Sequence, residues 1–124
     1  MTRANDLAAW LQAQLSLRSV AVESPLSEDA LPGAIVHYTG AGNGDTLDPE
    51  LRTEGYQVAL KANSVGADPL QIATEIGRIE ARLMSIINGP ERRGRWDHIT
   101  ATLVGAERLA GISLWQFTLL VRGE

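Results

Sequence analysis

The chain has 124 residues and no cysteine, and its 11 Lys and Arg against 15 Asp and Glu give a formal net charge of −4. This length predicts one domain, since two cores would each be of marginal size, and the acidic balance argues against a general affinity for the nucleic-acid backbone. The absence of cysteine excludes disulfides and thiolate metal sites, and it agrees with folding in a reducing cytoplasm. No apolar run approaches the roughly 20 residues of a membrane span, and Asp6 interrupts any signal-peptide pattern, so we expect a soluble chain.

The first expected element is an N-terminal helix over about residues 5–17, with Asn5 or Asp6 as its cap. Its apolar residues recur at helical spacing, at Leu7, Trp10, Leu11, Leu15 and Leu17. Trp10 is interpreted as a core residue rather than a partner-facing anchor, because it lies on a stripe of leucines. The segment SVAVE then predicts a short strand, and SPLSEDALPG predicts a loop.

A second strand, AIVHYTG, leads into a Gly-rich segment, predicted as a flexible loop over about residues 39–50. His37 is interpreted as an ordinary strand histidine, because no other metal ligand lies nearby. The loop lacks the Lys-Ser/Thr pair and helix start of a P-loop, so its glycines do not predict a phosphate site. Asp45 and Asp48 could hold a cation, but two aspartates in a flexible loop are normally just solvated.

The chain is organised around the strand YQVALKA, at 56–62, and a long helix over about residues 68–88. Alternation along the strand points Lys61 away from the core. Asp68 is expected to cap the helix, and Pro69 suits its first turn. An apolar stripe on this helix predicts one buried face, made of Ile72, Ile76, Ile79, Leu83 and Ile86.

The opposite face of this helix is polar and is predicted to meet water or a partner. It carries Gln71, Glu75, Arg78, Arg82 and Ser85. Glu75 can pair with Arg78 within the helix. Arg78 and Arg82 repel one another one turn apart, so we expect an acidic group from another chain to neutralise Arg82.

The last third predicts a C-terminal β-hairpin over about residues 96–122, preceded by a loop that gathers three arginines, Arg92, Arg93 and Arg95. These arginines could meet a phosphate or an acidic subunit, although a solvated loop is the simpler interpretation. Asp97 and His98 are adjacent in a strand, so they point to opposite faces and do not predict an acid–base pair. The final strand is apolar on both faces, which predicts a central position in the sheet or cover by another subunit.

The predicted fold class is α+β, in the order α-β-β-β-α-β-β: a mostly antiparallel, twisted sheet with one long helix packed on a face, together with an N-terminal helix. The second face of the sheet then needs a cover, and the first helix and a neighbouring protomer are the two candidates. The sequence indicates no catalytic or metal site and no cofactor. From the residues alone, we expect a small domain with an association role.

These segments resemble the tail terminator and minor capsid proteins of long-tailed bacteriophages. The resemblance rests on the capped first helix, the Gly-rich loop before YQVALKA, the helix DPLQIATEIGRIEARLMSIIN and the closing strands that end in QFTLLVRGE. It implies a non-enzymatic virion protein that forms a hexameric ring on the tail tube, stops tube elongation and offers a surface for head–tail joining. The implied partners are other copies of the chain, the tail tube protein and the head–tail connector protein, without a membrane and without specific nucleic-acid recognition even if DNA passes through the ring lumen.

The same resemblance implies a location at the head-proximal end of the tail, with assembly in the cytoplasm of the host bacterium. The candidate interface residues are Arg78, Arg82, Arg92, Arg93, Arg95, Asn43 and Asp45. A head-closure or neck connector protein is the alternative function. A small ligand-binding or enzymatic α+β domain is the second alternative, and it would need a pocket with convergent polar groups.

Overall fold

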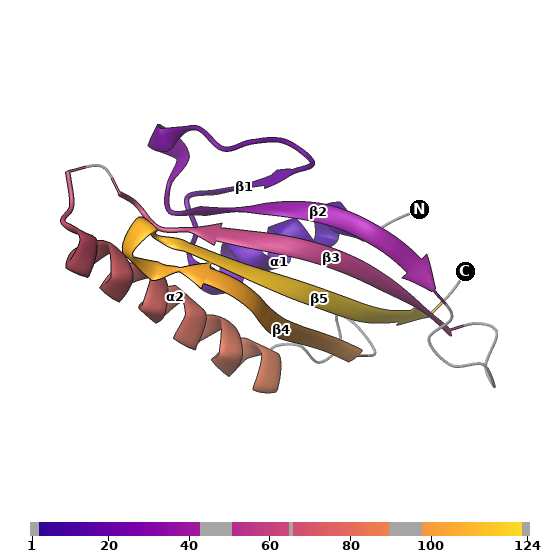
Figure 1. Ribbon diagram of the computed structural model, residues 1–124. Helices are drawn as coiled ribbons and strands as arrows, with labels where there is room; N and C mark the ends of the chain where they lie inside the picture. Colours follow the sequence, from indigo (N-terminus) through magenta and orange to yellow (C-terminus); the bar gives the residue numbers. More distant parts are fainter. Residues whose placement is uncertain (1–2, 43–50, 65, 90–97, 123–124) are drawn as a thin grey trace.

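The computed structural model describes residues 3–42, 51–64, 66–89 and 98–122, with two α-helices against a five-stranded sheet (Figure 1). The helices are α1 (Ala4–Leu15) and α2 (Pro69–Asn88). The strands are β1 (Ser19–Val22), β2 (Gly33–Gly42), β3 (Leu51–Lys61), β4 (His98–Glu107) and β5 (Ile112–Arg122). The predicted α+β class and the order of its elements are confirmed.

The strand order across the sheet is β1-β2-β3-β5-β4. Three of the four pairings are antiparallel, as predicted, but β1 runs parallel to β2, so the sheet is mixed. The segment between β1 and β2 includes a short 3-10 helix at Glu28–Ala30 and carries the chain back along the length of β1. β2 therefore begins beside the first residue of β1, with Gly33 paired to Ser19, and the two strands run parallel. The apolar strand β5 lies inside the sheet between β3 and β4, which accounts for its two apolar faces.

Both helices belong to a single core, against the same face of the sheet. On that face the side chains of Val58 and Phe117 are fully buried, and they share the core with Leu11 of α1 and Ile76 of α2. The first helix therefore does not cover the second face of the sheet, which corrects one of the two predicted covers. Two amphipathic helices can pack side by side on one face because each needs burial for only one stripe.

The long helix agrees closely with its prediction. Asp68 caps it, because one of its carboxylate oxygens accepts hydrogen bonds from the backbone N–H groups of Leu70 and Gln71, each at 2.9 Å. All five residues of the predicted stripe are buried: Ile72, Ile76, Ile79, Leu83 and Ile86. Helical spacing alone was therefore sufficient to identify the face that α2 turns to the sheet.

The start of α1 is different from its prediction. The N-cap residue is Arg3, which makes no side-chain cap, and Asn5 and Asp6 lie inside the helix. Instead, the backbone N–H of Arg3 donates to the Glu54 carboxylate and to the Tyr56 hydroxyl, each at 2.9 Å. A contact 51 residues away in the chain thus fixes a helix start that a local cap was expected to fix. Trp10 is buried in the core, as predicted.

Two strands are longer than the sequence predicted, and a third ends later than predicted. Residues 39–42 of the predicted Gly-rich loop are the end of β2, and β3 begins at Leu51 rather than at residue 56. In the hairpin, β4 continues to Glu107 and a short 3-10 helix, Arg108–Ala110, makes the turn. Glycines suggested loops in these segments, but cross-strand pairing over the whole length of β3 extends the sheet beyond them. Residues 43–50 and 90–97 lie outside the described part of the chain.

Candidate functional site

The sheet face opposite the helices is covered by neither helix, and we call it the open face. Along each strand, residues of the open face alternate with residues of the buried face. One row across four strands is polar, because register aligns His37 with Gln57, Gln57 with Gln116, and Gln116 with Thr102. The neighbouring row is apolar, with Ile35 paired to Ala59 and Ala59 paired to Leu114.

Charged side chains lie at the margins of the open face. Lys61 and Glu107 both pair with Ile112 of β5 at one end of the sheet, and the Glu23 carboxylate contacts His37 at one edge. Lys61 therefore points away from the core, as predicted. The middle of the open face is uncharged, and its side chains on β3 and β5 are half-buried by their own neighbours. Such a surface costs little to desolvate, because few ions would have to lose their hydration.

His37 lies at the edge of the open face with one partner in its own chain. Its Nδ1 is 2.6 Å from Oε2 of Glu23, and Oε1 of the same carboxylate accepts a hydrogen bond from the backbone N–H of Tyr38 at 2.6 Å. The hydrogen bond from Tyr38, followed by that of His37, lowers the pKa of the Glu23 carboxyl. Among the described residues, no three His, Cys, Asp or Glu side chains gather as a metal site would require.

The polar face of α2 carries two of the predicted interface residues. Arg78 is exposed and lines a shallow hollow of about 470 Å³ on the first half of the helix. Leu70, at 74% the most exposed of the large apolar side chains described, lines the same hollow. Glu75 accepts a hydrogen bond at 3.2 Å from the backbone N–H of Asn63, a partner the sequence did not indicate.

Arg82 has a partner in its own chain that the sequence did not indicate. Its Nε donates to the backbone carbonyl oxygen of Gln14 at 3.1 Å, near the last turn of α1. Cations are favourable at helix C-termini, where carbonyl groups lack partners within the helix. Arg82 thus joins the two helices, and because its side chain is still exposed, an acidic group of another chain as its partner stays a prediction.

The other predicted interface residues cannot be placed. They lie outside the described part of the chain: Arg92, Arg93, Arg95, Asn43 and Asp45. The same holds for Asp48 and for Asp97, the sequence neighbour of His98. Of the seven candidates, the structure therefore places Arg78 and Arg82, both on α2 but with different surroundings.

Sequence analysis missed a buried polar network that joins α2 to the hairpin. Arg108 donates from two nitrogens to the two carboxylate oxygens of Glu80, at 2.9 and 3.1 Å. Ser113 Oγ donates to Glu80 Oε2 at 2.7 Å, and Trp115 Nε1 donates to Ser113 Oγ at 2.7 Å. Burial raises the pKa of Glu80, but the hydrogen bonds from Arg108 and Ser113 lower it by more, so it lies below its ordinary value.

A second buried carboxylate, Glu54 of β3, was also missed. Besides Arg3, it binds the Tyr56 hydroxyl at 2.6 Å and the Arg52 guanidinium at 2.8 Å. The available signal was an acidic residue at a core-facing position of a strand, two residues before Tyr56. Both carboxylates are engaged by groups of their own chain, which indicates structural roles.

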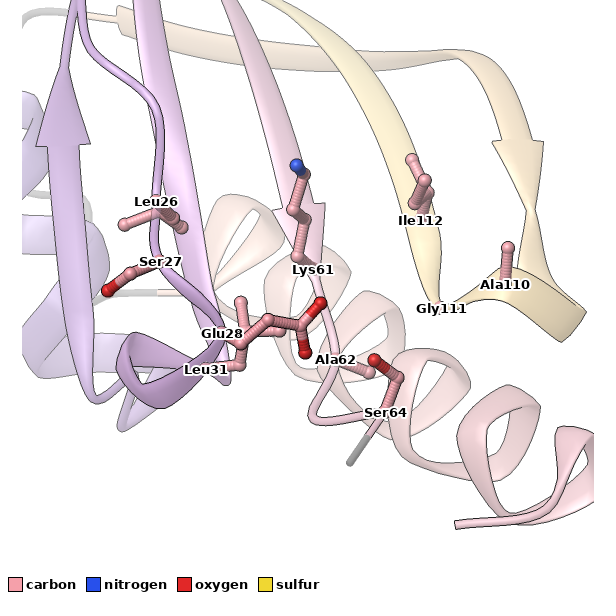
Figure 2. A pocket seen from close by; sticks show the side chains of 10 residues that line it. All are labelled: Leu26, Ser27, Glu28, Leu31, Lys61, Ala62, Ser64, Ala110, Gly111 and Ile112. Atoms are coloured by element: carbon pink, nitrogen blue, oxygen red, sulfur yellow. The ribbon is translucent and has the colours of Figure 1, made fainter. Parts of the chain in front are cut away.

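A second, smaller hollow lies at the end of the sheet (Figure 2). Its volume is about 150 Å³, and its polar side chains include Glu28, Lys61 and Ser64. In Figure 2 the Lys61 ammonium points away from the Glu28 carboxylate, so these groups do not converge. Small-molecule sites usually measure about 300–1,000 Å³ and converge a few polar groups, so this hollow does not meet that description.

One wall of this hollow is Gly111, at the turn between β4 and β5. Its φ is +74°, and a Cβ atom there would lie 2.6 Å from Cγ2 of Ile72 on α2. Its backbone carbonyl accepts a hydrogen bond at 2.9 Å from the N–H of Ala62, beyond the end of β3. Gly111 therefore brings the hairpin turn into contact with both the sheet and the long helix.

Comparison with known proteins adds no relative to this geometry. The chain matches no protein-family model and no curated protein sequence. Within the described residues, neither helix is long and apolar enough to cross a membrane. The two exposed surfaces, the open face and the polar face of α2, are therefore the candidate functional sites.

Proposed function

We propose that this chain is a structural virion protein, a tail terminator of a long-tailed bacteriophage. In this proposal it forms a ring, with six copies as the expected number, that caps the tail tube, stops its elongation and presents a surface to the head–tail connector. The site of action is the head-proximal end of the tail, after assembly in the cytoplasm of the host bacterium. The chain has no enzymatic role here, and DNA passes the ring without being specifically recognised.

The observation that carries this proposal is the one-sided covering of the sheet. Both helices lie on one face, and the middle of the open face is uncharged, with Ile35, Ala59 and Leu114 in one row. An extended surface of this kind suits association with other subunits better than chemistry on a small molecule. The resemblance of the strand–helix unit and the closing strands to tail terminators supports the more specific assignment.

The polar face of α2 is the second proposed contact. Arg78 and Leu70 both line its shallow hollow, about two helical turns apart, and both are exposed. Arginine is favoured at interfaces because its planar group can pair with a carboxylate while its stem covers apolar surface. In a ring, one subunit would offer this helix face to a different surface of the next subunit.

The test is assembly on isolated tail tubes. The purified chain should give rings by negative-stain imaging, either alone or after tail tubes are added, and it should bind at tube ends. The variant Thr118→Lys, which places a charge in the middle of the open face, is expected to lose this binding. Ala13→Lys adds the same charge at an exposed position of α1 and should behave as the unchanged protein.

Two outcomes would redirect the assignment. If assembly without the chain gives tails of normal length that fail to join heads, the chain is a neck connector rather than a terminator, since loss of a terminator gives overlong tails. If the chain stays monomeric, ignores tube ends and is thermally stabilised by a small metabolite, the structural role is wrong and a ligand-binding domain takes its place.

A further inference from the structure

The strand β4 forms one edge of the sheet and offers a long row of backbone groups. Among the described strands it pairs only with β5, and it is ten residues long. Most of its residues are exposed, including Leu103 at 40% and Val104 at 54%. The opposite edge is different, because β1 has only four residues. An exposed edge of this length is a template for a further strand.

The sequence of β4 has few of the features that prevent edge pairing. Proteins protect edges with lysine, proline, inward charges or bulges. Between Ile99 and Ala106 there is no charged residue and no proline. A bulge is present where the pairing with β5 shifts between Leu103 and Gly105, with Val104 as the extra residue. The bulge changes the register of this edge, and that change matters for which strand can pair with it.

We propose that β4 pairs antiparallel with β4 of a second copy of this chain, across a two-fold axis at Thr102. Such an axis is perpendicular to the sheet and keeps the two open faces on the same side. Directly opposed residues must then share a face. His98 pairs with Leu120 and Glu107 pairs with Ile112, both on the open face, because the bulge adds one residue between them.

The strand is self-complementary in this arrangement. His98 of one copy lies opposite Glu107 of the second copy, so each end places an imidazole against a carboxylate. On the helix-covered side, Leu103 lies opposite Ala101 of the second copy, which removes exposed apolar surface from water near the axis. Thr102 lies opposite Thr102, a pairing that is favourable between strands. The product is a continuous sheet of ten strands, five from each copy.

This contact is separate from the proposed ring. A two-fold contact uses the same patch on both copies and closes on itself, so it makes a dimer and cannot propagate around a ring. We therefore assign it to the free chain in solution. It is tested without tail tubes, so its failure would leave the tail terminator proposal untouched, and a failure to cap tubes would leave this contact untouched.

Cysteine cross-linking tests the register directly, because the chain contains no cysteine of its own. In Thr102→Cys the two cysteines would face one another across the axis, with Cβ atoms about 4.5–5.5 Å apart, close to what a disulfide requires. In Thr100→Cys they would be about 13 Å apart, four positions along the strands. Both threonines are exposed on the open face, so the variants are matched.

Under mild oxidation, Thr102→Cys should give a covalent dimer at least about tenfold faster than Thr100→Cys, since only its thiols meet disulfide geometry. Equal rates, or no dimer from either variant, would overturn the proposal. Sedimentation of Thr102→Lys gives a second readout, because the two lysines would lie directly opposite one another across the axis, where like charges repel, and should weaken the dimer about tenfold. Ala13→Lys introduces the same charge at an exposed position of α1, outside both proposed contacts, and should sediment as the unchanged chain; loss of its dimer would also contradict the inference.

Discussion

Glu80 is a buried charge where α2 meets the β4–β5 hairpin. Its carboxylate is largely enclosed, at 11% exposure of the side chain, and it accepts hydrogen bonds from Arg108 and Ser113. A buried charge is tolerated when such partners compensate for the hydration it loses. The network therefore sets how α2 meets the turn that follows β4.

Replacing Glu80 with glutamine tests this compensation. The amide keeps the size of the side chain but loses the charge, so its hydrogen bonds from Arg108 and Ser113 weaken. We expect a loss of about 1–2 kcal/mol in the free energy of unfolding, measured by urea denaturation at neutral pH. Glu75→Gln is the control on the same helix, because Glu75 accepts one backbone hydrogen bond at the surface, and it should change stability much less.

The pH dependence of stability follows from the same residue. The pKa of Glu80 is lower in the folded chain than its ordinary value of 4.5, so the unfolded chain takes up this proton at a higher pH than the folded chain. The stabilisation is therefore complete above about pH 4.5 and is lost as the pH falls below that value toward the folded pKa.

Urea midpoints measured from pH 7 down to pH 3 would check this dependence. The unchanged chain should lose more stability below about pH 4.5 than Glu80→Gln does, because the variant lacks the titrating group. Parallel curves for the two proteins would show that other carboxylates account for the acid sensitivity, and would contradict the role given to Glu80.

At the scale of single elements, α2 shows how much of a helix local sequence patterns can predict. Its start is marked by Asp68 and Pro69 and its buried face by spacing alone, so the sequence places it within one residue of its bounds. The start of α1 could not be found in this way, because Glu54 and Tyr56 hold it from a distant strand. Strand ends were underestimated for the same reason: pairing partners, rather than local propensity, decide where a strand stops.

The candidate surfaces likewise depend partly on local sequence patterns and partly on packing between distant segments. The open face could be anticipated from alternation, but the position of both helices on the other face depends on packing that no single segment encodes. The like charge one turn away predicted a partner for Arg82 on another chain, and it gave no sign of the hydrogen bond that Arg82 donates to a carbonyl group of α1. Backbone acceptors do not appear in a pattern of side chains, so this contact had no signal in the sequence.

The cap of α2 gives a prediction at this scale. Asp68→Ala removes two hydrogen bonds to the first turn and should lower the free energy of unfolding by about 1 kcal/mol. Asp68→Ser keeps a capping oxygen and should retain most of that stability. Urea denaturation of the two variants side by side measures the difference, and equal losses would mean that the cap contributes through the charge of Asp68 alone.

For the whole molecule, the single core implies one cooperative unfolding transition. The core joins α1, α2 and the sheet, with buried tryptophans at Trp10 and Trp115 in different elements. Helix content by circular dichroism and tryptophan fluorescence should therefore report the same midpoint. Separate midpoints would show that α1 unfolds independently of the sheet.

Two adjacent residues of α2 test how strongly the core depends on that helix. Leu83 is fully buried and Met84 is 40% exposed. Leu83→Ala should lower the free energy of unfolding by about 2–5 kcal/mol and should move both midpoints together. Met84→Ala, the control, should stay within about 0.5 kcal/mol, since substitutions away from the core seldom cost more.

Gly111 sets a limit on how this sequence can vary. Any side chain there would meet Ile72 and adopt an unfavourable φ of +74°, so Gly111→Ala should destabilise the chain. Gly77, in the middle of α2, has no heavy atom within 4 Å of where its Cβ would be, so Gly77→Ala should add about 0.5–1 kcal/mol of stability. In a library selected for folding, position 111 would keep glycine, while position 77 would change to alanine. A glycine that matches Gly111 is therefore the better marker for recognising relatives of this chain.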